Sequence, residues 1–251
     1  MPVLAGGDLK FRDDDGSADP RAAAALAAFA SGQGSEQAAL ATLAGSRLLV
    51  PVVAAVSEPK GLKAPARRAV DTARNAAAPG GSTQGGEKGS EMSLPTLVGR
   101  DGRRAIPAFT CLDALARWRP DARPVPAVAD LVWRAAVADS CAVVVDIAGP
   151  VPLAIDGARL AALAHGQPVP LPHEDPDVLS AVRAAAAGQA AITGLSVAAG
   201  QGGDDMLIEV TLAAGCAPAT ASESVGLLGA EVMTRLGGRL RRGIGVAVTP
   251  L

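Results

Sequence analysis

The sequence predicts an α/β (α+β) protein in which a mixed-sheet domain precedes a smaller α+β domain. Two Asp-Pro pairs, Asp19-Pro20 and Asp175-Pro176, each open an apolar segment. This pattern is typical of a helix start, because the carboxylate caps the first turn and the proline takes a position that needs no N–H. The run AVVVDIAG (142–149) is β-branched at successive positions, which indicates a strand covered on both faces. A chain of 251 residues is long enough to bury a core around such a strand.

The first domain is predicted over 19–165, after a disordered tail at 1–18. Helices are expected at 20–30 and 36–44, the second capped by Ser35, and a strand follows at 48–55. Pro51 cannot donate a ladder hydrogen bond, so this strand is expected at an edge or a bulge. Residues 57–93 contain few large apolar residues and have a centre rich in Gly, Ser and Gln, so a mobile insertion is predicted there.

The run 94–163 is predicted to form the centre of this domain. Asp101-Gly102 lies between two apolar runs and predicts a hairpin, since glycine adopts the positive φ of a tight turn without a clash. Thr110 is expected to cap a helix that Pro120 ends, with Asp113 completing a capping box. The further elements expected here are a helix at 127–138, strands at 141–147 and 151–155, and a helix at 157–164 capped by Asp156.

The second domain is predicted over 174–251, after a Pro-rich linker at 166–173. Its expected order is α-β-β-α-β, with helices at 177–187 and from Ser222 to Leu236. The expected strands are 190–198, 206–213 and 241–248. This order indicates a helix layer on a short sheet.

Three segments resemble a known family: DGRRAIPAFT (101–110), LARWRP (115–120) and VVVDIAGPVPLAIDGARLAAL (143–163). Together with SRLLVPVVA (46–54), they are similar to the N-terminal domain of the SseB ("enhanced serine sensitivity") family. The resemblance covers about residues 19–165. It implies a bacterial cytosolic protein with no established enzymatic activity. Two positions depart from the pattern: many relatives have a small hydroxyl residue at Cys111, and Asn-Pro near Asp146-Ile147.

The titratable residues do not predict a catalytic or metal site. Cys111 at a helix start is the most reactive-looking thiol, but a cysteine nucleophile needs a histidine base. Both histidines, His165 and His173, fall in or beside the linker. Three widely spaced cysteines match neither a disulfide framework nor a zinc pattern. No catalytic residue, metal or cofactor is therefore predicted.

Charge and hydropathy favour a cytoplasmic protein that binds neither nucleic acid nor membrane. The net charge is −2, and the densest basic group (Arg235, Arg239, Arg241, Arg242) ends a helix, where cations offset the macrodipole. No apolar run approaches the roughly 20 residues that cross a bilayer, and the first residues do not resemble a signal peptide. The favoured function is a non-enzymatic binding or regulatory module with an unidentified protein partner. Two alternatives remain: a small-molecule-binding domain or uncharacterised enzyme, and a nucleic-acid or ribosome-associated accessory protein.

The expected binding site lies where two strands end. Ligands of α/β sheets bind outside the carboxyl ends of parallel strands. If the strands ending at Phe109 and Ile147 are parallel neighbours, their following turns open at one edge. The predicted binding residues are Phe109, Thr110, Cys111, Trp118, Asp146 and Gly149, with Trp118 on the rim.

Overall fold

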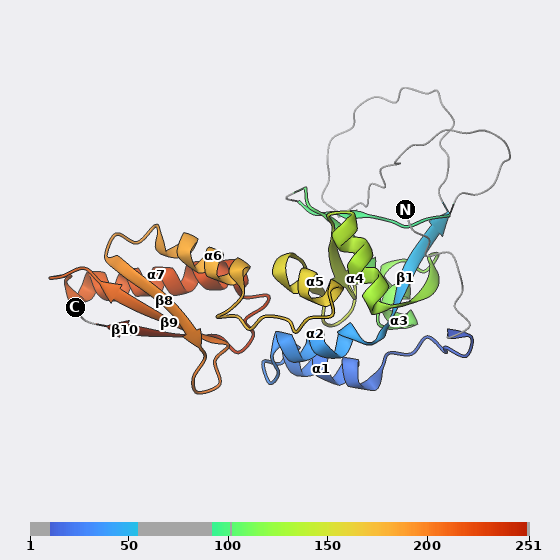
Figure 1. Cartoon of the computed structure of the whole chain (residues 1–251), viewed down its shortest axis with the longest axis horizontal. Helices are drawn as coiled ribbons and strands as arrows, with labels where there is room; N and C mark the ends of the chain where they lie inside the picture. The colour runs from blue at the N-terminus through green and yellow to red at the C-terminus, as the bar shows by residue number, and fades with distance from the viewer. Residues whose placement is uncertain (1–10, 55–91, 101, 250–251) are drawn as a thin grey trace, which may run out of the picture. The chain divides into compact units, whose positions relative to one another are not determined.

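The computed structural model describes residues 11–54, 92–100 and 102–249 (Figure 1). Helices and mixed or antiparallel sheets alternate along this part of the chain, which confirms the predicted α+β class. Of the predicted insertion at 57–93, residues 57–91 lie outside the described residues. Contacts divide the chain into unit 1, residues up to 18 and 47–155, and unit 2, residues 19–46 and 156–251. The domain limits 19–165 and 174–251 remain a prediction.

The described residues of unit 1 form two sheets. In the first, β1 (Arg47–Ala54) pairs antiparallel with β2 (Met92–Ser93) and with β5 (Arg123–Val128). The second has the order β3-β4-β6-β7, formed by β3 (Leu97–Val98), β4 (Arg104–Ala108), β6 (Ala142–Val145) and β7 (Leu153–Ile155). Strands β4 and β6 are parallel, and the other pairs are antiparallel. The described part of unit 1 also includes the helices α3 (Leu112–Trp118) and α4 (Ala129–Ala138).

The predicted hairpin and buried strand are both confirmed. Strands β3 and β4 pair antiparallel around Gly102, whose φ is +79°, and Gly99 N–H donates to Arg103 O at 2.8 Å. Strand β6 lies inside its sheet, with Val143 and Val145 fully buried. The alternation of buried and half-buried side chains along β6 shows that one of its faces is covered more completely than the other.

The prolines of the first sheet stand at positions where no ladder hydrogen bond is lost. Strand β1 is the middle strand of this sheet and not the predicted edge strand. Its Pro51 is opposite Pro124 in β5. Leu49, two residues earlier, exchanges backbone hydrogen bonds of 2.7 and 2.8 Å with Phe109 on the side away from β5. Because N–H directions alternate along a strand, the nitrogen of Pro51 also faces away from β5. Strand β5 was not predicted, because Pro124 and Pro126 argue against a strand. The following helix consequently begins at Ala129 rather than at residue 127.

Unit 2 contains five helices and one sheet among its described residues. The helices are α1 (Pro20–Ala30), α2 (Glu36–Ala44), α5 (Gly157–Ala164), α6 (Pro176–Ala186) and α7 (Pro218–Leu236). The sheet has the order β10-β9-β8, with β8 (Ile192–Ala199) antiparallel and β10 (Ile244–Thr249) parallel to β9 (Met206–Leu212). Along the chain, the elements α6, β8, β9, α7 and β10 follow one another in the α-β-β-α-β order that the sequence predicts. Helix α7 begins at Pro218 rather than at Ser222, because proline is well suited to a first helical position.

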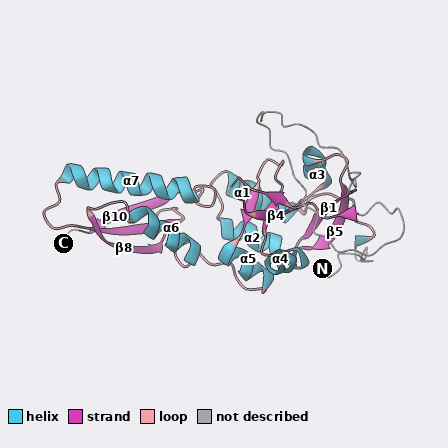
Figure 2. Ribbon diagram, turned by 90° about the horizontal axis from the view of Figure 1, so that it is seen from above, coloured by secondary structure: helices cyan, strands magenta, loops and turns pink. Residues whose placement is uncertain are grey.

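One face of the unit 2 sheet carries the core. The alternate side chains Met206, Ile208 and Val210 of β9 are fully buried and cluster with residues of α6 and α7. Figure 2 shows the long α7 running alongside the three strands. The predicted caps Asp19 and Asp175 accept hydrogen bonds of 2.7 and 2.8 Å from the first turns of α1 and α6. No described helix is both long and apolar enough to span a bilayer.

Candidate functional site

The carboxyl ends of β4 and β6 meet at one edge of their sheet. The two strands are parallel, with Ala108 in register with Val145, as the predicted site requires. Asp146 N–H continues the ladder by donating to Ala108 O at 2.9 Å. The residues that follow each strand, Thr110 and Asp146, are thereby brought together.

Thr110 and Asp146 form a buried polar corner. The backbone N–H of Thr110 donates to one carboxylate oxygen of Asp146 at 2.8 Å, and its hydroxyl donates to the other at 2.6 Å. Asp146 has a φ of +50°, a conformation that Asp and Asn tolerate better than most residues. Gly149 closes the turn by donating to Asp146 O at 2.7 Å, and a Cβ on Gly149 would lie 2.8 Å from the Asp146 Cβ. The turn therefore requires glycine at 149.

Burial sets the protonation behaviour of this corner. Removing the Asp146 carboxylate from water raises its pKa, and the two hydrogen bonds from Thr110 offset only part of that rise. Both carboxylate oxygens are engaged by Thr110. The corner therefore fixes the turn, because each Asp146 carboxylate oxygen accepts a hydrogen bond from Thr110.

Thr110 is not the helix cap that the sequence predicts. Cys111 occupies the N-cap position of α3, and its side chain makes no capping hydrogen bond. The Thr110 hydroxyl is instead committed to Asp146, which lies 36 residues later in the chain. Local sequence favours the capping box, and the long-range carboxylate outcompetes it.

The predicted aromatic residues lie against each other beside the corner. Phe109 is fully buried, and its ring centroid is 5.4 Å from that of Trp118 with an interplanar angle of 33°. Trp118 is half-buried, and the Arg119 guanidinium lies 5.9 Å from its ring centroid. Phe109 thus belongs to the core beneath the site, whereas Trp118 reaches the surface.

An N-terminal segment that sequence reasoning missed lies on the same edge. Residues 11–18 depart from the predicted disordered tail because Arg47 holds Asp14. The guanidinium contacts the Asp14 carboxylate at 2.5 and 2.8 Å and donates to Ser17 O at 2.5 Å and Thr110 O at 2.9 Å. Leu112 N–H donates to Gly16 O at 2.9 Å. Residues 13–17 are called the N-terminal strap below. Spacing in the sequence gives no signal for this pair, since 33 residues separate Asp14 from Arg47.

Apolar side chains project around the polar corner. Ile147, directly after Asp146, is 38% exposed, and Leu112, two residues after Thr110, is 39% exposed. Cys111, which lies between Thr110 and Leu112 in the chain, is half-buried. The edge thus presents apolar surface to solvent while its polar groups are paired internally.

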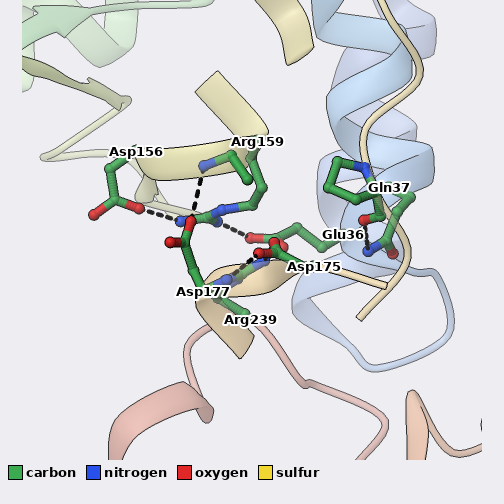
Figure 3. Close-up of polar contacts among 9 residues, drawn as sticks. Glu36, Gln37, Asp156, Arg159, Asp175, Asp177 and Arg239 are labelled. Atoms are coloured by element: carbon green, nitrogen blue, oxygen red, sulfur yellow. Dashed lines mark hydrogen bonds and ion pairs between the residues drawn. The ribbon is translucent and has the colours of Figure 1, made fainter. Parts of the chain in front are cut away.

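A second polar cluster lies in unit 2 (Figure 3). Its members, called the Glu36 network below, are Glu36, Asp156, Arg159, Asp175 and Arg239. One Glu36 oxygen accepts from Arg159, and the other accepts from Arg239 Nε at 3.2 Å. Arg159 also binds Asp156 at 2.6 Å, and Arg239 binds Asp175 at 2.5 Å. The network joins α2, α5, the start of α6 and the segment after α7.

The Glu36 network is buried, and its charges depend on one another. Glu36, Asp175 and Arg159 are each almost fully buried. Burial opposes the charge on Arg239, but the carboxylates of Glu36 and Asp175 outweigh it and raise the Arg239 pKa. Arg159 Nε has no hydrogen-bond partner among the described residues. These features indicate that the network stabilises the fold, because each arginine pairs with two carboxylates.

Helix α5 is capped by a residue of helix α6 and not by Asp156, the cap that the sequence predicts. Asp156 occupies its N-cap position, but no capping hydrogen bond comes from that side chain. The Ala158 N–H donates instead to Asp177, in the first turn of α6, at 2.8 Å. Gly157 has a φ of +54°, and a Cβ there would overlap the Asp177 carboxylate. Glycine at 157 permits this cap.

The arginines of the predicted basic cluster are engaged within unit 2. Arg241 lies 5.6 Å from the ring centroid of Phe29. The other three are paired with carboxylates: Arg235 with Glu231 (2.7 Å), Arg239 with Asp175 (2.5 Å) and Arg242 with Asp205 (2.9 Å). These contacts offset most of the positive charge on which a nucleic-acid interface would rely.

Among the residues that the structure describes, no group of three or more His, Cys, Asp or Glu side chains could hold a metal ion. His165 Nδ1 is 2.7 Å from Ala161 O, within its own helix end. His173 lies 3.8 Å from Glu174. These contacts engage both histidines locally.

The comparisons with known proteins give one result. The family model described as the SseB protein N-terminal domain matches residues 23–162, more than half of the chain. No curated protein and no solved structure matches the chain.

Proposed function

This chain belongs to the family of the SseB protein N-terminal domain, and from that premise we propose that it is a non-enzymatic, cytoplasmic binding module of a bacterium. Its partner is a protein, which docks at the carboxyl edge of β4 and β6. Cys111 and Trp118 contact the partner, together with Leu112 and Ile147. Phe109, Thr110, Asp146 and Gly149 hold these contact residues in place from beneath.

The observation that carries this proposal is that the polar groups at this edge are hydrogen-bonded within the chain, whereas apolar side chains there are exposed to solvent. Both Asp146 oxygens are occupied by Thr110, and the Arg47 guanidinium is occupied by Asp14, Ser17 and Thr110. A site built for acid–base chemistry needs a titratable group within reach of its substrate. Here Ile147 and Leu112 are exposed, and the burial of apolar surface is the main favourable contribution to most protein–protein association.

Trp118 adds the kind of side chain that binding surfaces favour. Its ring rests on the buried Phe109 and is half-exposed, so it loses little conformational freedom on binding. Tryptophan and arginine are enriched where a few residues dominate an interface, and Arg119 lies over the same ring.

Site-specific photo-crosslinking in cells tests the proposal. A benzophenone amino acid replaces Ile147 in the full chain, and the control replaces Val137, which lies in α4 of the same unit and is 40% exposed. The proposal predicts a discrete adduct of one mass from position 147 that is absent from position 137. Adducts of equal yield from both positions, or none from position 147, would contradict it.

A further inference from the structure

The N-terminal strap has the features of a peptide bound to the edge of β4 and β6. Asp14 supplies a carboxylate to Arg47, and the two side chains bury each other to 14% exposure. Ser17 O takes a further donor of the same guanidinium. Three of the four contacts that Arg47 makes here therefore come from the strap, and Thr110 O supplies the fourth.

The backbone of the strap also makes specific contacts, in addition to those of the Asp14 carboxylate. Gly16 accepts a hydrogen bond from Leu112 N–H, a first-turn donor of α3 that has no partner within its own helix. Gly16 has a φ of +75° and is buried, and a Cβ there would overlap the Leu112 side chain. Both the conformation and the close approach require glycine at this point.

These contacts select one pattern: a carboxylate residue, one intervening residue, and a glycine. Asp15, the intervening residue, is exposed, and its carboxylate accepts from Ser17 N–H at 2.9 Å within the strap rather than from the site. Asp13 is also exposed, and the described residues offer its side chain no hydrogen bond or ion pair. Arg47 is the cation that such a segment would neutralise, which makes the charges complementary.

We propose that Arg47, whose guanidinium also donates to Thr110 O, and the backbone and side chain of Leu112 form a recognition site for an extended acidic peptide of the form Asp-x-Gly. Residues 14–16 occupy this site in cis, and the corresponding segment of a partner protein displaces them. The inference rests on the proposed function and names the chemical class of its partner. A charge-assisted pair with a carboxylate anchors the peptide, and the Leu112 amide fixes its register.

Tethering makes the strap a strong competitor. The strap is joined to Arg47 through residues 18–46, which include α1 and α2, so it competes with a free peptide as part of the same chain. A free peptide with the same sequence therefore binds the native chain weakly, although the site recognises it. A variant that weakens the strap without altering the site removes this competition.

Fluorescence anisotropy with a labelled peptide FRDDDGSADP (residues 11–20) tests the proposal on the full chain. The variant Asp14→Asn weakens the strap, and Asp13→Asn is its matched control, because it makes the same charge change at a neighbouring residue outside the site. We expect Asp14→Asn to bind the peptide about tenfold more tightly than the wild type or Asp13→Asn does, the effect of one charge-assisted contact. The gain is lost when Arg47→Met is added.

A second peptide, carrying Asn in place of Asp14, should bind none of these chains measurably. Tryptophan fluorescence checks that each variant is folded, since both tryptophans lie in unit 1 with the site. Equal affinity of the first peptide for wild type, Asp13→Asn and Asp14→Asn would overturn the proposal, and so would equal binding of the two peptides. A crosslinked partner at position 147 without peptide binding would remove this inference and leave the proposed function in place.

Discussion

Replacing Glu36 by alanine should destabilise unit 2 more than any surface charge change. The carboxylate is 2% exposed and holds Arg159 and Arg239 at once. Removing one member of a buried ion pair costs about 3–5 kcal/mol, because the remaining charge stays buried. Each arginine keeps another carboxylate, Asp156 or Asp175, so we expect a loss near the lower limit, about 3 kcal/mol.

The matched control is Glu231→Ala. Glu231 pairs with Arg235 at 2.7 Å, but the two side chains are 44% and 45% exposed, and they stand four residues apart on α7. Such exposed helix pairs contribute about 0.3–0.5 kcal/mol. The comparison therefore changes the same residue type and the same kind of ion pair, and differs in burial.

Urea unfolding followed by circular dichroism at 222 nm is the suitable measurement. Both tryptophans lie in unit 1, so fluorescence does not follow the helices of unit 2 directly. The account predicts that Glu36→Ala lowers the free energy of unfolding in water by about 3 kcal/mol at an unchanged m-value. A loss within about 0.5 kcal/mol of that for Glu231→Ala would show that the Glu36 network contributes little.

Two further predictions concern the Thr110–Asp146 corner. Asp146→Ala should cost about 2–4 kcal/mol in chemical unfolding, since it strands the buried Thr110 N–H and places alanine at φ +50°. Asp146→Asn should cost less than about 1 kcal/mol, because Asn accepts from that N–H and tolerates the same φ; equal losses would refute this. Burial raises the Asp146 pKa above its ordinary 3.8. The folded chain thus holds this proton more tightly than the unfolded chain, and its contribution to stability falls as pH rises from about 4. Asp146→Asn should remove that fall, and an unchanged pH profile would contradict the assignment.

Local signals in the sequence predict much of the secondary structure. Asp19, Ser35 and Asp175 each cap the helix that they precede, and Gly102 turns the hairpin. These features depend on residues a few positions apart. The β-branched run at 143–145 likewise predicts a strand, because such side chains pack well on a pleated surface.

The errors arise where distant residues decide a side chain's partner. Thr110 has the sequence of a helix cap, yet its hydroxyl binds Asp146. Glu36 looks like a favourable first-turn carboxylate, but 203 residues separate it from Arg239, with which it pairs. Nothing in the local pattern distinguishes such a residue from an exposed one. Strand β5 was missed because its prolines are permitted only by the register with β1.

The candidate site also depends on contacts between residues that are distant in the sequence. Thr110, Asp146 and Gly149 come together because β4 and β6 are parallel, a pairing that the sequence allows but does not specify. The N-terminal strap was not foreseen, because an acidic, glycine-containing segment is typical of a solvated tail. Its docking depends on Arg47, which the strand β1 positions beside Thr110 O.

The most direct test of protein binding at this edge uses the native cysteines. Cys111 lies in the proposed interface and Cys216 precedes α7 in unit 2, and both are partly exposed, whereas Cys141 is buried. Alkylation of each thiol is followed by mass spectrometry in living native cells and in the purified chain. The account predicts that Cys111 reacts several-fold more slowly in cells while Cys216 reacts at the same rate in both. Equal rates for Cys111 in cells and in the purified chain would contradict a partner at this edge.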